Sequence, residues 1–258
     1  MNNSVALPAV EMSEKTDVAV GERYVSMSNA VARAAQGLGL VEKRAIMLGL
    51  AKTDSVPISH LQRANTHGWK VRITAQEYID TFNVDAKSAY RQLIEAGDKF
   101  REKYVRRTEY NRRGKLIEHY YAWLSGATYH HGEGWVELRF SHEIAPFLLG
   151  LREKFLSYQL KLVGNLRSVY AWRLFEILQS WKTHGVWRVS VDEFCRIMEA
   201  APSFQKNFGM LNRRVIEPSV RELRDINGMN IDVQFIRSGR KVTDLEFRFS
   251  ESQQQRLF

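Results

Sequence analysis

The chain has 258 residues, of which 44% are hydrophobic and 26% charged, a composition typical of a folded protein with enough apolar material for two modest cores. Its formal net charge is +9, and no apolar stretch approaches the length of a membrane span. The N-terminus lacks the pattern of a secretory signal, and the single cysteine, Cys195, excludes an internal disulfide framework. We therefore expect a cytoplasmic protein without cofactor or metal that attracts polyanions, with Cys195 as a small buried hydrophobe.

Residues 1–25 show no helical or strand periodicity and predict a flexible tail. Ser28 is placed to cap a helix, and apolar residues recur at helical spacing up to Ala51. Pro57 and the polar stretch 65–68 predict a loop.

A helix-turn-helix is predicted from residue 71 onward. Residues 71–73 alternate as a strand does, and Thr74 with Glu77 forms a capping-box pattern that begins a short helix to about Thr81. Residues 82–84 predict a tight turn, after which Asp85 is placed to cap a second helix. That helix would bury Ala89 and Leu93 on one side and turn a polar face outward. Two short helices joined in this way are typical of DNA-binding proteins.

Strand-forming residues follow at 104–108, 117–123 and 135–140, with turns predicted at 111–115 and 130–134. Seven basic and two acidic residues lie between Arg101 and Lys115. We therefore expect the hairpin around residues 111–115 to be a wing with a strongly positive tip.

The second half repeats this order. Ser168 is placed to cap an amphipathic helix, residues 187–189 predict a strand, and Ser190 with Glu193 repeats the capping-box pattern 116 positions after Thr74. A basic helix over about 206–226 and strands at 231–235 and 242–249 complete the repeat. The sequence thus predicts an α+β fold of tandem winged-helix domains, predominantly helical with β-hairpin wings, over residues 26–160 and 161–258.

The basic helix of the second half is the strongest candidate for reading bases. Its apolar residues from Leu211 to Leu223 fall on one stripe, and Pro218 predicts a kink. Arg213 and Arg214 are expected to read bases, because the planar guanidinium matches the two acceptors of guanine. The other residues expected at phosphates or bases on this helix are Lys206, Asn207 and Arg221. A merely solvated charged face is the alternative.

Three residues, Lys87, Ser88 and Arg91, occupy the corresponding exposed face in the first half. Here Arg91 has the alternative of pairing with Glu95 one turn later. Basic side chains at the two hairpin tips suit phosphate or minor-groove contacts, which position a protein but carry little sequence information. They are Arg112, Arg113, Lys115, Arg237, Arg240 and Lys241.

Four stretches resemble the initiator replication proteins of iteron-containing plasmids. They lie at Ala34 to Leu50, Ile73 to Leu93, Val136 to Leu160 and Leu211 to Asn227, and the last contains the string Arg213-Arg214-Val215-Ile216-Glu217-Pro218. The resemblance covers about residues 28–250.

The resemblance implies that the C-terminal domain binds double-stranded DNA tightly and sequence-specifically. It implies that the N-terminal domain contacts DNA in the monomer and forms the dimer surface in a repressor form. Monomers would bind direct repeats at a plasmid origin in the bacterial cytoplasm, and homodimers would bind an operator and repress the protein's own gene. A host replication initiator and a replicative helicase are the implied partners.

Two alternatives remain. A dedicated transcriptional repressor would share both domains. Candidates for a dimer surface are Leu38, Leu48 and the strand faces of the first domain, with ordinary core positions as the alternative. A nicking rolling-circle initiator would be an enzyme, and the pair His130-His131 invites that reading as a metal site. Adjacent residues on a strand point to opposite faces, however, so the pair is poorly placed to share a metal ion. The sequence also lacks a P-loop motif, and we expect a binding protein rather than an enzyme.

Overall fold

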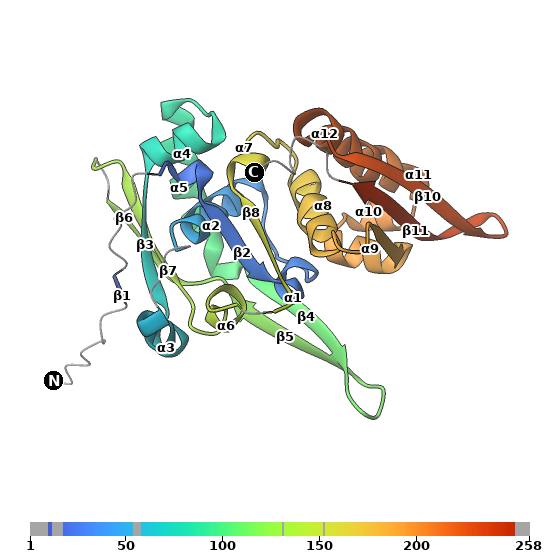
Figure 1. Cartoon of the computed structure of the whole chain (residues 1–258), viewed down its shortest axis with the longest axis horizontal. Coiled ribbons are helices and arrows are strands. Elements are labelled where there is room, and N and C mark those ends of the chain that lie inside the picture. The colour runs from blue at the N-terminus through green and yellow to red at the C-terminus, as the bar shows by residue number, and fades with distance from the viewer. Residues whose placement is uncertain (1–9, 12–17, 54–57, 131, 152, 251–258) are drawn as a thin grey trace.

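The structure is a computed structural model that describes residues 10–11, 18–53, 58–130, 132–151 and 153–250. Helices and mostly antiparallel strands form two units, the second of which extends to the right in Figure 1. Buried apolar side chains of both units belong to one continuous cluster. The expected α+β class is confirmed.

The N-terminal unit is built around a four-stranded sheet with the order β1-β3-β7-β6. In this sheet β3 and β7 are antiparallel, with Ile73 opposite Val136, and both side chains are buried. The elements of this unit are β1 (Val10–Glu11), a 3-10 turn (Val20–Glu22), β2 (Tyr24–Ser28), α1 (Asn29–Ala32), α2 (Leu40–Ala51), α3 (Ile58–His67), β3 (Trp69–Thr74), α4 (Ala75–Phe82), α5 (Ala86–Lys99), a 3-10 turn (Phe100–Glu102), β4 (Tyr104–Tyr110), β5 (Leu116–Ala122), β6 (Leu124–His130), β7 (Trp135–Phe140), α6 (Ala145–Leu148), β8 (Phe155–Gln159) and α7 (Lys161–Gly164).

The C-terminal unit contains a three-stranded sheet with the order β10-β11-β9. Phe247 of β11 lies opposite Trp187 of β9, and the two rings stack with centroids 5.2 Å apart. The elements are α8 (Val169–Ser180), β9 (Val186–Ser190), α9 (Val191–Met198), α10 (Pro202–Gln205), α11 (Phe208–Leu211), a π-helical turn (Asn212–Ile216), α12 (Glu217–Asn227), β10 (Asn230–Ser238) and β11 (Lys241–Ser250).

The two units repeat one arrangement. Each unit contains a first helix, a strand, two further helices and a hairpin, in that order. These elements are α2, β3, α4, α5 and β6–β7 in the first unit, and α8, β9, α9, α11–α12 and β10–β11 in the second. The paired strands also follow the same order, β3-β7-β6 and β9-β11-β10. Each unit is therefore a winged helix, in which a hairpin returns to pair with the strand that precedes the helix-turn-helix. The predicted tandem fold is confirmed.

The identity of the first wing was predicted wrongly. The β4–β5 hairpin forms a separate two-stranded sheet, whereas β6–β7 pairs with β3 and is the true counterpart of β10–β11. Strand β6 was not predicted. The β4–β5 hairpin is thus an insertion between α5 and the wing, and its basic tip is not the tip of the winged helix.

Three further expectations differ from the structure. Residues 65–67 belong to α3 and not to the predicted loop. Ala64 anchors this helix in the core, and Gly68 follows its last residue with a φ of +72°. Of the stretch predicted as a loop at 65–68, only Gly68 lies outside the helix. Leu38 and Leu48 are core residues, 7% and 0% exposed, and not the exposed surface positions that were expected. The predicted tail extended to residue 25, whereas Val20 is buried and Val25 lies in strand β2. Pro57 lies outside the described residues.

A buried charged cluster joins the two units at their equivalent first helices, α2 and α8. Lys43 Nζ lies 2.6 Å from Glu176 Oε2, and both side chains are fully buried. Arg173 Nη1 reaches the same oxygen at 3.0 Å, and the Tyr158 hydroxyl donates to the other carboxylate oxygen at 2.9 Å. Burial lowers the pKa of Lys43 from its ordinary value to about 7, against the opposing effect of Glu176.

The loop after α1 makes further contacts between the two units. Its backbone N–H groups at Gln36 and Gly37 both donate to Glu199 Oε2, at 3.1 and 2.8 Å. Arg33 donates to the Ser180 carbonyl at 2.7 Å and stacks over Trp181 at 4.1 Å. These contacts fix α8 and the end of α9 against the N-terminal unit.

Candidate nucleic-acid interface

The first helix-turn-helix, α4 and α5, is set by local hydrogen bonds that the sequence predicted. Thr74 Oγ1 accepts from the Glu77 N–H while Glu77 accepts from the Thr74 N–H, a complete capping box. Asn83 takes the left-handed conformation at the turn, with φ 49°. Asp85 caps α5 by accepting from the Ser88 N–H at 2.9 Å, and hydrogen bonds from Ser88 lower the pKa of its carboxyl.

The outward face of α5 carries the residues predicted to meet DNA. Lys87 and Arg91 are exposed, and Ser88 is partly exposed beside the cap. Arg91 Nε lies 3.9 Å from Glu95 Oε1 in a pair whose two side chains are both more than half exposed. Such an exposed pair stabilises a helix little, so Arg91 is available to a stronger anion.

The second helix-turn-helix leads from α9 into one long helical stretch, α11 through α12. Ser190 caps α9 as predicted, but Glu193 binds Arg196 at 2.5 Å instead of completing a capping box. Asn207 caps α11 by accepting from the Met210 N–H at 3.1 Å. The apolar stripe is confirmed, because the following side chains are buried: Leu211, Val215, Ile216, Val220 and Leu223.

A π-helical turn occupies Asn212–Ile216, directly before Pro218. Proline lacks an N–H and its ring crowds the carbonyl four residues earlier, here that of Arg214. A π turn at this point widens the helix and removes the need for that hydrogen bond. The predicted irregularity at Pro218 therefore takes the form of a π turn that contains Arg213 and Arg214, both exposed.

Other basic side chains stand at the start of this helical stretch, along it and on the hairpin tips. Lys206, Asn207 and Arg221 are exposed, as are Arg237, Arg240 and Lys241 at the tip of β10–β11, where Gly239 has a φ of +59°. At the tip of β4–β5, Asn111 Oδ1 accepts from the N–H groups of Arg113 and Lys115, at 2.9 and 3.0 Å. Arg112, Arg113 and Lys115 are exposed there.

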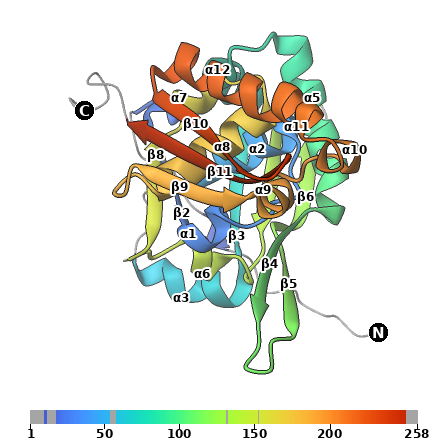
Figure 2. The ribbon, with the colours of Figure 1, turned by 90° about the vertical axis from the view of Figure 1, so that its right-hand side faces the viewer.

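The structure brings some of these residues together and separates others. Figure 2 shows α5 and α11 along the same side of the molecule. The tip of β4–β5 points to the opposite end from α12 in both Figures 1 and 2. The hairpin tip that carries Arg112, Arg113 and Lys115 therefore lies away from α12.

The true first wing carries a stack of rings in place of arginines at its tip. The Arg72 guanidinium lies 3.9 Å from the centroid of the Trp135 ring, and His130 stacks on the same residue at 3.3 Å. Trp135 Nε1 donates to Glu133 at 2.8 Å. His131 lies outside the described residues, and the described part of the chain holds no group of three or more metal-ligating side chains.

Two consecutive helix-turn-helix units, each completed by its own hairpin, define a tandem winged-helix protein. The chain belongs to the family of initiator replication proteins: the family description "Initiator Replication protein, WH1" matches residues 24–179 and "Initiator Rep protein, WH2" matches residues 190–249. This confirms the resemblance noted in the sequence. All of helix α8 except its last residue, Ser180, falls within the first of the two matches.

Three known proteins are similar to this chain. The chain is similar to the crystal structure of Pi initiator protein in complex with iteron DNA, with a TM-score of 0.68 and 18% identity over 90% of this chain and 99% of that one. It is 29% identical over 115 residues to the probable replication protein rep of Bifidobacterium longum, a match spanning 45% of this chain and 38% of that protein. It is also 26% identical to an uncharacterized 27.6 kDa protein of Escherichia coli, over 78% of this chain and 84% of that one.

None of the helices in the described residues has the length and apolar character that crossing a bilayer requires.

Proposed function

We propose that this protein initiates plasmid replication by binding double-stranded DNA repeats at an origin, with α5 and α11–α12 in two successive major grooves. One observation carries the proposal: two equivalent helices with exposed basic side chains lie along the same side of one chain, and a buried ion pair and hydrogen bonds between the units hold them in a fixed relation. A rigid pair of this kind suits two grooves about 10.5 base pairs apart. The likeness to a fold solved on iteron DNA supports the same assignment.

The proposal gives the main sequence readout to the C-terminal unit. Arg213 and Arg214 read bases, each bidentate contact contributing about 1–3 kcal/mol of discrimination. Lys206, Asn207 and Arg221 flank them on the same helical stretch, and Lys87, Ser88 and Arg91 form the corresponding set in the first unit. Arg237, Arg240 and Lys241 bind phosphates or the minor groove beside the second helix-turn-helix.

The inserted hairpin receives a more general role in this proposal. Because its tip points away from α12, Arg112, Arg113 and Lys115 attract DNA phosphates without entering the same grooves as α5 and α12. Their contribution is electrostatic and falls with salt. Changing Arg112 and Arg113 together should weaken binding to all sequences alike.

Footprinting the purified protein on the DNA that flanks its own gene tests the proposal. Protected direct repeats would support an initiator, while a lone palindrome would instead indicate a dedicated repressor. Arg213→Ala and Arg214→Ala should abolish preference for the repeat and leave weak, salt-sensitive binding. Arg188→Ala on β9 is a matched control, because Arg188 is exposed and β9 lies away from α11 in Figure 2. Specificity that survived both recognition-helix changes would refute the assignment.

The same proposal includes autorepression by a homodimer on an operator, and recruitment of a host initiator and a replicative helicase in the bacterial cytoplasm. Initiation on this account is DNA binding and assembly without covalent chemistry. Incubation with supercoiled origin DNA checks this point, since nicked product would favour a rolling-circle enzyme. Sedimentation with and without the repeat DNA tests whether a monomer is the origin-bound form.

A further inference from the structure

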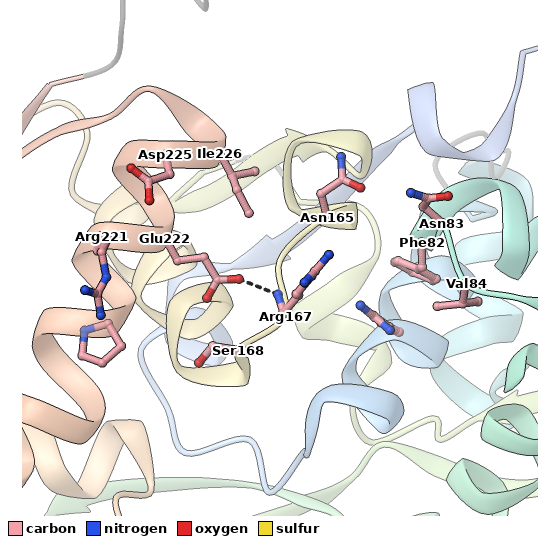
Figure 3. Close-up of a pocket in the computed structure, with 12 residues that line it drawn as sticks. Phe82, Asn83, Val84, Asn165, Arg167, Ser168, Arg221, Glu222, Asp225 and Ile226 are labelled. Atoms are coloured by element: carbon pink, nitrogen blue, oxygen red, sulfur yellow. Dashed lines mark hydrogen bonds between the residues drawn. The ribbon is translucent and has the colours of Figure 1, made fainter.

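A cleft of about 680 Å³ lies where the two winged helices meet. Four segments line it: α2 through Arg44, the end of α4 with the turn that leads to α5, the connection from α7 to α8, and α12. Figure 1 shows α4 and α12 on the upper side of the molecule, flanking this region, and Figure 3 shows the side chains that line it. The cleft thus separates the first turn of α5 from the exposed face of α12.

A buried cation that has no anionic partner among the described residues lines the cleft. Arg44 is 7% exposed, and its guanidinium lies 5.3 Å from the centroid of the Phe82 ring. Its Nη2 donates to the Leu166 carbonyl at 3.2 Å, while Nε has no hydrogen-bond partner in the part of the chain that the structure describes. Removing an arginine from water without a counter-charge is costly, so a site that keeps one in this state is suited to an anion.

Two more arginines stand at the cleft from different segments. Arg167 comes from the connection between the units and Arg221 from α12, and both are exposed. Within the described part of the chain, Arg44, Arg167 and Arg221 form no ion pair. Two carboxylates also line the cleft, but Glu222 is engaged by the Arg167 backbone N–H at 2.5 Å. Asp225 is the remaining acid, and the three arginines outnumber the two carboxylates.

We propose that this cleft binds a phosphate group of the DNA backbone, at the strand that crosses between the groove read by α5 and the groove read by α12. The inference rests on the proposed function. Two successive major grooves are separated by sugar-phosphate backbone, and the cleft occupies the corresponding position between the two helices. Arginine is the side chain best matched to a phosphate, since its N–H groups form paired, charge-assisted hydrogen bonds. Asn83 and Asn165, both exposed at the cleft, supply neutral donors beside the arginines.

Exposed Arg167 permits a test that leaves the fold intact. Arg167→Gln should lower affinity for the repeat DNA about tenfold, as expected for one charge-assisted contact. The slope of log affinity against log salt should fall by about 0.9, the value for one phosphate. Arg188→Gln removes the same charge from the far side of the C-terminal unit and should change neither quantity beyond a small, uniform amount.

DNA with single uncharged backbone linkages can show which phosphate contacts the cleft. Single methylphosphonate linkages, which carry no charge, are placed in turn along the repeat. Wild-type protein should lose affinity when the neutral linkage lies between the two half-sites, and the Arg167→Gln protein should be insensitive at that same linkage. Independent, additive losses at every linkage would overturn the cleft assignment while leaving the repeat binding of the wild type in place.

Inorganic phosphate distinguishes the DNA backbone from a free anion. For a free anion, phosphate would raise the melting temperature of the wild type but not of Arg167→Gln, while the DNA titrations of the two proteins would coincide. That result would make the cleft a site for a small anion, and the proposal would be wrong. A wild-type protein that binds no repeat DNA at all would instead refute the proposed function.

Discussion

Glu176→Gln should be among the most damaging single-atom changes in this protein. The substitution exchanges one carboxylate oxygen for an amide nitrogen of nearly the same size and leaves the amide able to hydrogen bond with Tyr158. It removes the negative charge that faces both Lys43 and Arg173, at 2.6 and 3.0 Å from Glu176 Oε2. All three side chains are 3% exposed or less, so water cannot replace the lost counter-charge.

Removing one partner from a buried pair costs about 3–5 kcal/mol, which is a large part of the total stability of a domain. For a chain of this size such a loss lowers the melting temperature by about 6–20 °C. Urea unfolding, followed by circular dichroism and by tryptophan fluorescence, measures the free-energy change directly. Lys43→Met is the informative comparison, because it leaves Glu176 paired with Arg173 and should cost less. A Glu176→Gln loss below about 1 kcal/mol, or one smaller than that of Lys43→Met, would show that the cluster does not hold the units together as argued.

Three other changes probe separate parts of the structure. Glu199→Gln weakens the hydrogen bonds from the Gln36 and Gly37 N–H groups. It should lower affinity for the natural repeat more than affinity for a repeat with one base pair inserted between its half-sites. Equal losses in gel-shift titrations of the two DNAs would contradict a role of Glu199 in setting the distance between the two recognition helices. Gly97→Ala places a Cβ 0.9 Å from Tyr129 Oη, so either the Tyr129 ring or α5 must shift, at a cost of about 1–3 kcal/mol. Calorimetry should show a smaller loss when the same change is made in a Tyr129→Ala background, and an unchanged loss would argue against the clash. The pKa of Lys43 is about 7 in the folded state, against an ordinary value of 10.5. Between these two values the folded state binds fewer protons than the unfolded state. The contribution of Lys43 to the free energy of unfolding therefore rises with pH from about 7 to 10.5 and is lost as pH falls through 7. The difference between wild type and Lys43→Met should follow this rise, whereas a pH-independent difference would refute it.

Features set by neighbouring residues were predictable from the sequence. Thr74, Asp85, Ser168 and Ser190 all cap the helices that they were expected to cap, because an N-cap depends only on the next three residues. The apolar stripe of α11–α12 followed from helical spacing in the same way.

Features set by distant residues were not predictable. Choosing between β4–β5 and β6–β7 as the first wing requires knowing which hairpin pairs with β3, and β6, which contains Ser125, Gly126 and Ala127, has a weak strand pattern. Helix α3 is polar over residues 65–67 and forms because Ala64 packs in the core.

The candidate site also has one part that was predictable from neighbouring residues and one part that was not. The exposed arginines of α11–α12 were found from their helical positions, but Arg44 and Arg167 were missed, since they meet only across the junction of the two units. One signal was available: Lys43 and Arg44 follow Glu42 in an otherwise largely apolar helix, a pattern that indicates buried charged side chains.

Directed cleavage of DNA from each recognition helix tests the central claim most directly. Iron–EDTA is tethered to a single introduced cysteine, Ala86→Cys at the start of α5 or Glu217→Cys at the start of α12, both at exposed positions. The native Cys195 need not be removed, because it is 3% exposed and burial raises the pKa of its thiol to about 11. The account predicts two cleavage centres on the same repeat, about 10.5 base pairs apart. Cleavage centred on one shared groove, or from only one of the two helices, would contradict it.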